Sequence, residues 1–283
     1  MMLNAERRTN MPVNKKIAII FEVCILSGFL SGGCYKPTDY PQVDKSIDYL
    51  PIPVRQSVAG ISVEKRPIMY HIIGQGQEVI FILAAIHGDE PAGITLANRL
   101  ADFLQQNRQK LLRGRTVLIL PIANPDGVAE NSRLNANKVD LNRNFASENR
   151  VNSKEFGLTA LSEPEAHIIT QLIRQYKPER IISLHQVIDS GPEGMATTMP
   201  NGCIDYDGPG EALANHMAKY CDLPVNKLGA NPGSLGSYAG LTLGIPTITF
   251  EMQKNDSKLN PEILWQRYGN ALLSAITYPN PIQ

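Results

Sequence analysis

The sequence has no excess of charge of either sign and no long basic run. Its 27 Lys and Arg residues balance 27 Asp and Glu residues. Without a basic excess, the chain lacks the electrostatic attraction that holds proteins on nucleic acid phosphates. Neither a solenoid-length repeat nor a collagen-like glycine period is present, and the hydrophobic content of 43% is too high for a disordered chain. The composition therefore predicts a compact protein with no nucleic acid partner.

The longest apolar run is too short to cross a bilayer comfortably. It extends from Ile17 to Leu30 and contains Glu22, whereas a spanning helix needs about 20 apolar residues. Lys15 and Lys16 precede the run, and small residues follow it. This order is typical of an export signal. We therefore expect residues 1–33 to be a signal peptide, with initiation at Met11.

A cysteine follows the small residues directly. The segment Ser31-Gly32-Gly33-Cys34 resembles the lipobox of bacterial lipoproteins, in which the cysteine is acylated and becomes the new N-terminus. The resemblance implies a lipid anchor on Cys34, contact with a membrane through that anchor alone, and a place in the periplasm or cell envelope. Ordinary secretion is the alternative, because Ser31 stands where the motif prefers leucine. Residues 34–62 contain four prolines and no sustained period, which predicts a tether.

Strand-like and helix-like blocks alternate over residues 63–283, which we expect to form one domain. The predicted strands are Ile68–Ile73, Val79–Ile86, Thr116–Ile122, Ile181–Leu184 and Pro246–Phe250, and the predicted helices are Ala92–Leu104, Pro164–Tyr176, Glu211–Tyr220 and Pro261–Tyr278. The first two strands flank Gly74 and Gly76 and are expected to pair as a hairpin. The alternation predicts an α/β sheet, in which ligands gather at the carboxyl ends of the strands.

Two of these strand ends carry groups that bind metal ions. His87 and Glu90 follow Val79–Ile86 directly, and His185 follows Ile181–Leu184. Two ligands close together, a distant third and a fourth position left for water is the common arrangement of catalytic zinc, and two histidines with one glutamate form a known ligand set. Taken singly, His-x-x-Glu more often marks a surface turn, and a lone histidine more often belongs to the core.

Further motifs follow in a characteristic order. They are Asn124-Pro125-Asp126-Gly127, the segment from Arg133 to Phe145 that ends in Asp-Leu-Asn-Arg-Asn-Phe, Ser162-Glu163-Pro164-Glu165, and Thr249-Phe250-Glu251. Together with His-x-x-Glu, these motifs give the chain a resemblance to the zinc metallocarboxypeptidases, and within them to the compact bacterial branch that includes murein peptide amidase. The resemblance extends from about Ile68 to Tyr278. It implies a catalytic domain folded as a three-layer α/β/α sandwich with a mixed central sheet.

The resemblance also implies a role for each residue that matches a family motif. His87, Glu90 and His185 match the ligands of one Zn2+ ion, and Asp140 matches the carboxylate that orients the first histidine. The family's general base, which takes a proton from the attacking water, is matched by Glu251.

Three further matches concern the transition state and the substrate. Arg133 matches the arginine that stabilises the oxyanion, and Asn142 and Arg143 match the pair that binds the terminal carboxylate of the substrate.

The segment Pro232 to Tyr238 resembles the loop that lines the specificity pocket in the bacterial branch. Leu235 and Tyr238 are therefore candidate pocket residues, and Leu235 suggests a pocket floor without charge. Asp89 stands where pancreatic members have an arginine. An extended peptide subsite built on that cation is therefore not expected, and the substrate is expected to be short or unusual.

Two cysteines lie beyond the signal and the lipobox. Cys203 and Cys221 flank the predicted helix Glu211–Tyr220. In an oxidising compartment, a disulfide between them would close a short loop and stabilise the fold by roughly 3 kcal/mol. Two unpaired buried cysteines are the alternative.

These features predict an exported zinc carboxypeptidase or amidase that cleaves a bond beside a free carboxylate. By analogy with murein peptide amidase, the expected substrate is a peptidoglycan peptide, cleaved between γ-D-glutamate and diaminopimelate. The alternatives are a general carboxypeptidase, an N-acyl amino acid deacylase of the aspartoacylase and succinylglutamate desuccinylase type, and a non-catalytic cell-wall binding module. The oligomeric state is left open by the sequence.

Overall fold

The computed structural model describes residues 53–106, 109–188 and 201–282. These residues belong to one compact unit, Asp44–Gln283. The expected signal peptide and Cys34 lie outside the described residues, as does most of the expected tether. Within the described ranges, no helix combines the length and the apolar composition that a membrane crossing requires.

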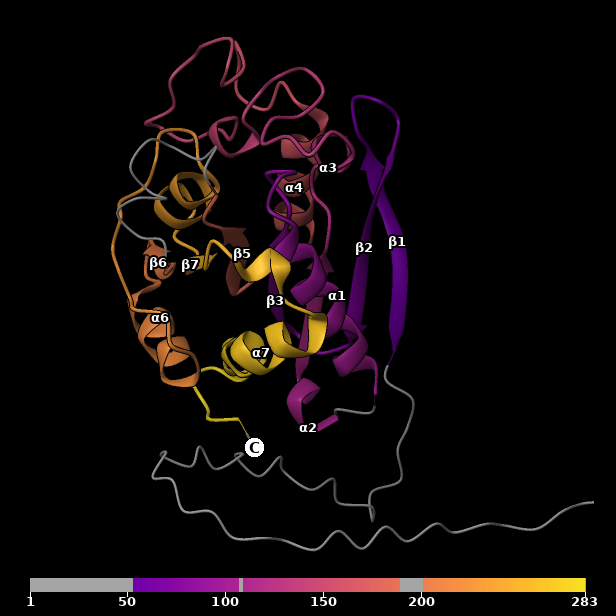
Figure 1. Cartoon of the computed structure of the whole chain (residues 1–283), viewed down its shortest axis with the longest axis vertical. Helices are drawn as coiled ribbons and strands as arrows, with labels where there is room; N and C mark the ends of the chain where they lie inside the picture. Colours follow the sequence, from indigo (N-terminus) through magenta and orange to yellow (C-terminus); the bar gives the residue numbers. More distant parts are fainter. Residues whose placement is uncertain (1–52, 107–108, 189–200, 283) are drawn as a thin grey trace, which may run out of the picture. The chain divides into compact units, whose positions relative to one another are not determined.

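Seven strands form one sheet in the order β1-β2-β4-β3-β5-β7-β6. They are β1 (Val54–Ile61), β2 (Pro67–Gly74), β3 (Glu78–Ala84), β4 (Arg115–Leu120), β5 (Arg180–Gln186), β6 (Cys203–Asp207) and β7 (Thr247–Met252). The four central strands run parallel, and the remaining three pair antiparallel, so the sheet is mixed. In Figure 1, β1 and β2 lie at one edge of the sheet and β6 and β7 at the other.

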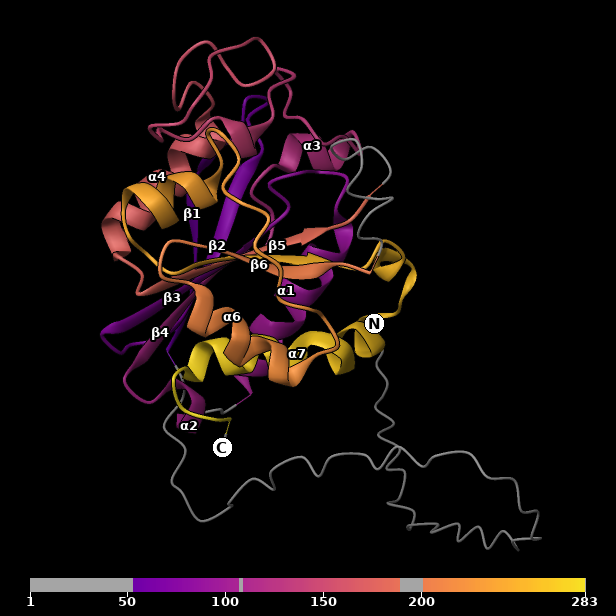
Figure 2. The ribbon, with the colours of Figure 1, turned by 90° about the vertical axis from the view of Figure 1, so that its left-hand side faces the viewer.

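Helices cover both faces of the sheet. They are α1 (Pro91–Gln105), α2 (Gln109–Leu112), α3 (Pro125–Ala129), α4 (Pro164–Tyr176), α6 (Glu211–Met217) and α7 (Pro261–Thr277), with the short turns η1 (Leu141–Arg143), η2 (Ala218–Tyr220) and η4 (Asp256–Lys258) and a π-helix, η3 (Gly236–Thr242). Figure 2 shows α1, α6 and α7 on one side of the sheet and α4 on the other. The predicted three-layer α/β/α sandwich is confirmed.

Strand alternation divides the core into two hydrophobic clusters. In β3, Ile80 and Ile82 belong to the cluster beneath α1 and α7, whereas Phe81 and Leu83 belong to the cluster beneath α4. Successive side chains of a strand point to opposite faces, and a parallel strand that is covered on both faces must be apolar on both. This is why the central strands appear in the sequence as unbroken apolar runs.

The predicted hairpin is wrong, because β4 lies between the two strands that were expected to pair. β2 pairs antiparallel with β4, and β3 pairs parallel with it. The connection passes across the beginning of β4, where a Cβ added to Gly76 would lie 1.8 Å from the carbonyl carbon of Gly114. Only glycine permits this close approach. β4 therefore lies inside the sheet, where its residues 117–120 are fully buried.

No pattern in the sequence predicts either edge strand. The tether expected over residues 34–62 ends early, because Val54–Ile61 forms β1 against β2. Most side chains of β1 are exposed, so the sequence shows no alternation there. At the other edge, β6 carries Asp205 and Asp207 within a run of only five residues.

The predicted disulfide is also corrected, since Cys203 and Cys221 are free cysteines. Cys203 alternates in β6 with Ile204, which belongs to the cluster beneath α6 and α7, so its side chain points to the opposite face of the sheet. Cys221 packs against that same cluster. The sheet therefore separates the two thiols.

The Asn-Pro-Asp-Gly motif holds the loops above the sheet together. The Asn124 side chain caps α3 by accepting a hydrogen bond from the Gly127 amide at 2.9 Å. The buried Asp126 carboxylate accepts hydrogen bonds from the Ser62 hydroxyl at 2.7 Å and from the Glu64 amide at 2.9 Å. These contacts join the β1–β2 turn to the loop that follows β4. The motif therefore builds the scaffold around the strand ends.

Candidate metal centre and substrate pocket

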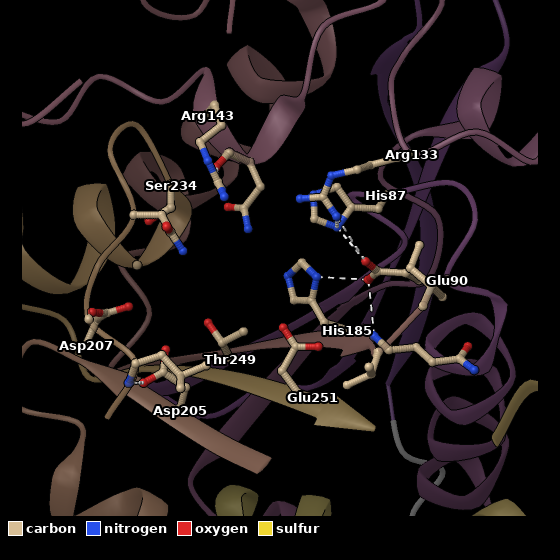
Figure 3. A pocket seen from close by; sticks show the side chains of 18 residues that line it. His87, Glu90, Arg133, Arg143, His185, Asp205, Asp207, Ser234, Thr249 and Glu251 are labelled. Carbon is tan, nitrogen blue, oxygen red and sulfur yellow. Dashed lines mark hydrogen bonds and ion pairs between the residues drawn. The ribbon is translucent and has the colours of Figure 1, made fainter. Parts of the chain in front are cut away.

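The carboxyl ends of β3, β5 and β7 meet at one pocket. His87 and Glu90 lie in the turn after β3, His185 lies near the end of β5, and Glu251 lies beside His185 in the register of β5 and β7. All four side chains are buried and line the pocket. Figure 3 shows them converging from these elements.

Close backbone contact positions the turn that carries His87 and Glu90. A Cβ added to Gly88 would lie 2.0 Å from the carbonyl carbon of Gly127. Only glycine permits this approach, because neither backbone can yield as a flexible side chain would. The turn after β3 is therefore held against α3, and His87 is held with it.

Three side chains in the pocket form a compact group of metal-binding atoms. One atom each from His87, Glu90 and His185 lies within 4.8 Å of the others. Nδ1 of His87 lies 2.6 Å from one Glu90 oxygen, and Nδ1 of His185 lies 2.9 Å from the other. Both rings thus direct the same nitrogen at the carboxylate.

The opposite nitrogen of each ring has its own partner. Nε2 of His87 lies 3.2 Å from the Asp140 carboxylate, and Nε2 of His185 lies 3.0 Å from the Ser183 hydroxyl. Partners of this kind fix the orientation and tautomer of a metal-binding histidine. Two oriented imidazoles and one carboxylate, with protein partners on the outer nitrogens, fit Zn2+. Ser183 lies inside β5, and no motif in the sequence marked it.

The charges of this group are balanced within the protein. Burial opposes ionisation of Glu90, yet the neighbouring His87 and His185 hold its pKa well below the usual range. Burial and Arg133 oppose protonation of His87, but Glu90 and Asp140 outweigh them and raise its pKa. The carboxylate is therefore ionised, and a metal ion must compete with a proton for His87.

Arg133 joins the metal-binding group to its outer partner. Its guanidinium lies 3.0 Å from the Asp140 carboxylate and 3.7 Å from Glu90, and Nη1 lies 3.2 Å from Nδ1 of His87. Burial lowers the pKa of Arg133, but the negative charges of Asp140 and Glu90 raise it by a larger amount. The pKa of Arg133 therefore lies above its usual value. A permanent cation is thus fixed beside the metal-binding atoms, where it can stabilise a developing oxyanion.

Glu251 is the buried carboxylate that faces this group from β7. Burial is the main cause that raises its pKa to about 7, and the negative charge of Glu90 adds to the effect. A cation bound beside it would favour the ionised form. A carboxylate whose pKa lies close to neutrality suits a group that must both accept and release a proton.

Asn142 and Arg143 form a wall of the pocket with hydrogen-bond donors and one positive charge, on Arg143. The Oδ1 atom of Asn142 accepts a hydrogen bond from the Leu235 amide at 2.9 Å, which leaves its NH2 group for the pocket. The Arg143 guanidinium donates to the Asn142 carbonyl at 2.7 Å, and among the described residues no carboxylate forms an ion pair with it. The wall is therefore suited to a bound carboxylate.

Neither of the two candidate specificity residues, Leu235 and Tyr238, belongs to the described residues that line this pocket. Leu235 and Tyr238 are only 2% and 3% exposed and pack in the cluster beneath α4, where the Tyr238 ring stacks on Phe145 at a centroid distance of 6.1 Å. The expectation that they contact substrate is therefore corrected. Leu235 acts through its backbone amide, which orients Asn142.

Asp205 and Asp207 take part in the pocket wall instead. Both line the pocket from β6, together with Thr249 of β7 and Ser234 beside the π-helix. The expectation of an uncharged pocket floor is thus corrected. No pattern in the sequence indicated these aspartates, because the short strand that carries them lacks an apolar alternation.

Comparison with protein families identifies the domain that carries this site. The family model described as zinc carboxypeptidase (Peptidase_M14) matches residues 44–189, slightly more than half of the chain. The chain belongs to the zinc carboxypeptidase family. It is therefore a hydrolase of a zinc-dependent family, with a group of two histidines and one glutamate at the place where a zinc ion fits.

This zinc carboxypeptidase is similar in sequence to murein peptide amidase A from two bacteria. Murein peptide amidase A of Escherichia coli (strain K12) is 34% identical over 194 residues, which cover 62% of this chain and 72% of that protein. Murein peptide amidase A of Vibrio campbellii is 28% identical over 199 residues, which cover 64% and 72%.

Solved structures show the same fold. Murein-tripeptide amidase MpaA from Escherichia coli O157 has a TM-score of 0.58 at 24% identity and covers 80% of this chain and 92% of that chain. Carboxypeptidase A from Helicoverpa armigera has a TM-score of 0.61 at 18% identity and covers 80% and 69%.

Replacing Asp140 with Asn should weaken zinc binding by this carboxypeptidase about 10- to 100-fold, because the His87 ring loses its charged partner. Competition with a chromophoric chelator measures the affinity. Asp102→Asn, at an exposed position of α1, removes the same charge away from the site and should leave zinc affinity unchanged. Equal zinc affinities for Asp140→Asn and the unchanged protein would contradict the role assigned to Asp140.

Proposed function

We propose that this zinc carboxypeptidase hydrolyses the amide bond next to a free carboxylate in a peptidoglycan peptide, between γ-D-glutamate and diaminopimelate, with one Zn2+ ion. The observation that carries the proposal is the arrangement of the pocket. The metal-binding group, the buried Glu251 and the Arg143 guanidinium, which forms no ion pair within the described residues, line the same cavity. A terminal carboxylate bound by Arg143 therefore places the preceding amide bond beside the groups that can cleave it.

Each charged group in the pocket has a defined part in hydrolysis. His87, Glu90 and His185 would hold a zinc ion, which would supply the Lewis acidity needed to acidify water and polarise the substrate carbonyl. Glu251 accepts one proton from the attacking water and donates it to the nitrogen of the amide bond that breaks. Arg133 donates hydrogen bonds to the carbonyl oxygen as negative charge develops there.

The substrate assignment draws on the relatives and on the pocket. Two relatives are named murein peptide amidase A, and a solved structure with the same fold is named murein-tripeptide amidase. The pocket combines the Arg143 cation and the neutral Asn142 amide with acidic groups at Asp205 and Asp207. Diaminopimelate carries both carboxylate and ammonium groups, so its charges complement the two parts of the wall.

The zinc-loaded protein should release diaminopimelate from murein tripeptide, and Glu251→Gln should lower kcat by at least about 100-fold because the amide cannot accept the proton. Mass spectrometry of the products measures the reaction. Glu262→Gln, at an exposed position of α7, is the matched control and should keep full activity. Release of ordinary C-terminal residues without cleavage of tripeptide would support a general carboxypeptidase, and cleavage of N-acetylaspartate a deacylase. Full turnover by Glu251→Gln would overturn the mechanism.

Replacing Arg143 with Met should raise KM for the free-acid tripeptide about 10- to 100-fold, because a charge-assisted hydrogen bond to the substrate carboxylate is lost. The same peptide with a carboxamide in place of that carboxylate should be a poor substrate for the unchanged enzyme. Its kcat/KM should be nearly the same for the enzyme and the variant. A variant that still prefers the free acid as strongly as the unchanged enzyme would show that another group binds the carboxylate.

We also propose that the protein is exported and held in the cell envelope by a lipid on Cys34. The support is the sequence alone: lysines, an apolar run with Glu22 inside it, and small residues directly before the cysteine. A peptidoglycan substrate is consistent with this location. The proposal is independent of the active site.

Cys34→Ser should abolish incorporation of radiolabelled palmitate into the full chain when it is expressed in a bacterial host, and should move the protein from the membrane fraction to the soluble fraction. Cys24→Ser removes a cysteine inside the apolar run and serves as the control that keeps the label. Palmitate that remains on Cys34→Ser would exclude this residue as the anchor.

A further inference from the structure

Two arginines reach the pocket from separate loops. Arg133 lies in the loop after α3 and Arg143 in η1, and both line the cavity. Figure 3 shows the two guanidinium groups in the upper part of the view. Burial lowers the pKa of Arg143, Asp140 opposes this effect, and the charge of Arg133 adds to it. Because the two cations repel each other, the backbone around them must fix their separation.

The loop that carries Arg133 is folded around the side chain of Asn135, which is 1% exposed. Its Oδ1 atom accepts hydrogen bonds at 3.1 Å from the amides two and four residues further on. Its Nδ2 atom donates to the carboxylates of Glu163 at 2.6 Å and Glu165 at 3.1 Å. The start of α4 therefore sets the position of the loop two residues beyond Arg133.

The turn that carries Arg143 is attached to the same place. Asn144 follows Arg143 directly and is fully buried. Its Nδ2 atom donates to the Ser162 hydroxyl at 3.0 Å, and its Oδ1 atom accepts a hydrogen bond from the Glu163 amide at 3.1 Å. The Ser162 hydroxyl in turn donates to the Glu163 carboxylate at 2.8 Å. Glu163 thus holds this turn through its amide directly and through its carboxylate by way of Ser162.

The Glu163 carboxylate is 4% exposed and forms no ion pair within the described residues. Neutral donors surround it instead. One oxygen accepts from the side-chain amides of Asn135 and Asn137, at 2.6 Å and 2.8 Å, and the other accepts from Ser162. Such charge-assisted hydrogen bonds are stronger than neutral ones, and a glutamine would offer only one acceptor oxygen. A single carboxylate therefore joins the loop of Arg133 to the turn of Arg143.

We propose that Glu163 is a positioning residue that fixes the separation of Arg133 and Arg143, and so matches it to the span between the terminal carboxylate and the reacting carbonyl of the substrate. The inference rests on the proposed function, because it takes Arg143 to bind that carboxylate and Arg133 to meet that carbonyl oxygen. Glu163 is not among the described residues that line the pocket. Asp140 pairs with the guanidinium of Arg133, whereas Glu163 holds the backbone from which that side chain extends.

A double-mutant cycle tests the inference. Glu163→Met keeps the length of the side chain and removes both acceptors. In the full-length, zinc-loaded enzyme it should lower kcat/KM for murein tripeptide about 10- to 100-fold, as expected when reacting groups are misplaced. In the Arg143→Met background the same change should cost about threefold or less, because a substrate held at one end can shift to meet Arg133. Equal losses in the two backgrounds would overturn the inference.

Two further variants separate positioning from stability. Glu163→Gln keeps one acceptor oxygen and should retain most of the activity that Glu163→Met loses. Asp126→Asn changes a buried carboxylate that holds the β1–β2 turn, and any loss it causes should be equal in the two backgrounds. A Glu163→Gln enzyme as impaired as Glu163→Met would contradict a role that depends on hydrogen bonding. Melting temperature and zinc content show whether each variant is folded.

Binding separates this inference from the proposed function. The probes are two phosphinate analogues of the tripeptide, which place oxygens where the oxyanion develops. One ends in a free carboxylate and the other in a carboxamide. In calorimetric titrations of the zinc-loaded protein, Glu163→Met should weaken binding of the acid about 10- to 100-fold and of the carboxamide about threefold or less.

The outcomes of these titrations differ for the two proposals. Equal weakening of both analogues, or no binding of either to the unchanged protein, would overturn the role of Glu163 even if the enzyme cleaves tripeptide. Selective weakening of the acid without any cleavage of tripeptide would support that role and contradict the proposed hydrolysis.

Discussion

The interaction on which the site depends is the buried contact of Glu90 with two histidines. A lone carboxylate at this depth would be neutralised by the cost of losing its hydration. Here each Glu90 oxygen faces a ring nitrogen of one histidine. Farther out, the negative charge of Asp140 is balanced by the positive charge of Arg133. The network holds its groups in one arrangement because the removal of any member leaves another buried charge without compensation.

The sheet supplies the rigidity that this network requires. Parallel strands buried on both faces end at one edge, and β5 and β7 hold His185 and Glu251 in adjacent positions through their backbone register. The turn after β3 is not part of the sheet, and its position is set by the contact of Gly88 with Gly127. The metal-binding group is thus assembled from two kinds of constraint, strand pairing and close backbone packing.

The parts of the fold that could be predicted from sequence are those with a strong local signal. Apolar runs marked the central strands, and α4 begins and ends where its periodicity predicted, at Pro164 and Tyr176. The order of strands was not predictable in this way, because the insertion of β4 beside β2 depends on contacts distant in sequence. β1 is largely exposed and β6 carries two aspartates, so neither strand has an apolar pattern.

The same distinction applies to the pocket. His87, His185 and Glu251 are polar residues at the ends of recognisable strands, which made them visible as candidates. Ser183 lies within an apolar strand and has no motif of its own. The orientation of Leu235 depends on the π-helix, which no local sequence pattern predicts. Resemblance to a family indicated the segment Pro232 to Tyr238 but could not show which of its side chains point into the core.

The hydrogen bond between the Leu235 amide and Asn142 ties one side of the pocket to the segment that begins the π-helix. The same segment leads into the π-helix whose glycines accommodate Asp207, so Asn142 and Asp207, which both line the pocket, share one support. A shift of that segment would disturb both contacts together. Evolutionary change around the pocket is therefore constrained to substitutions that leave the backbone of this segment in place.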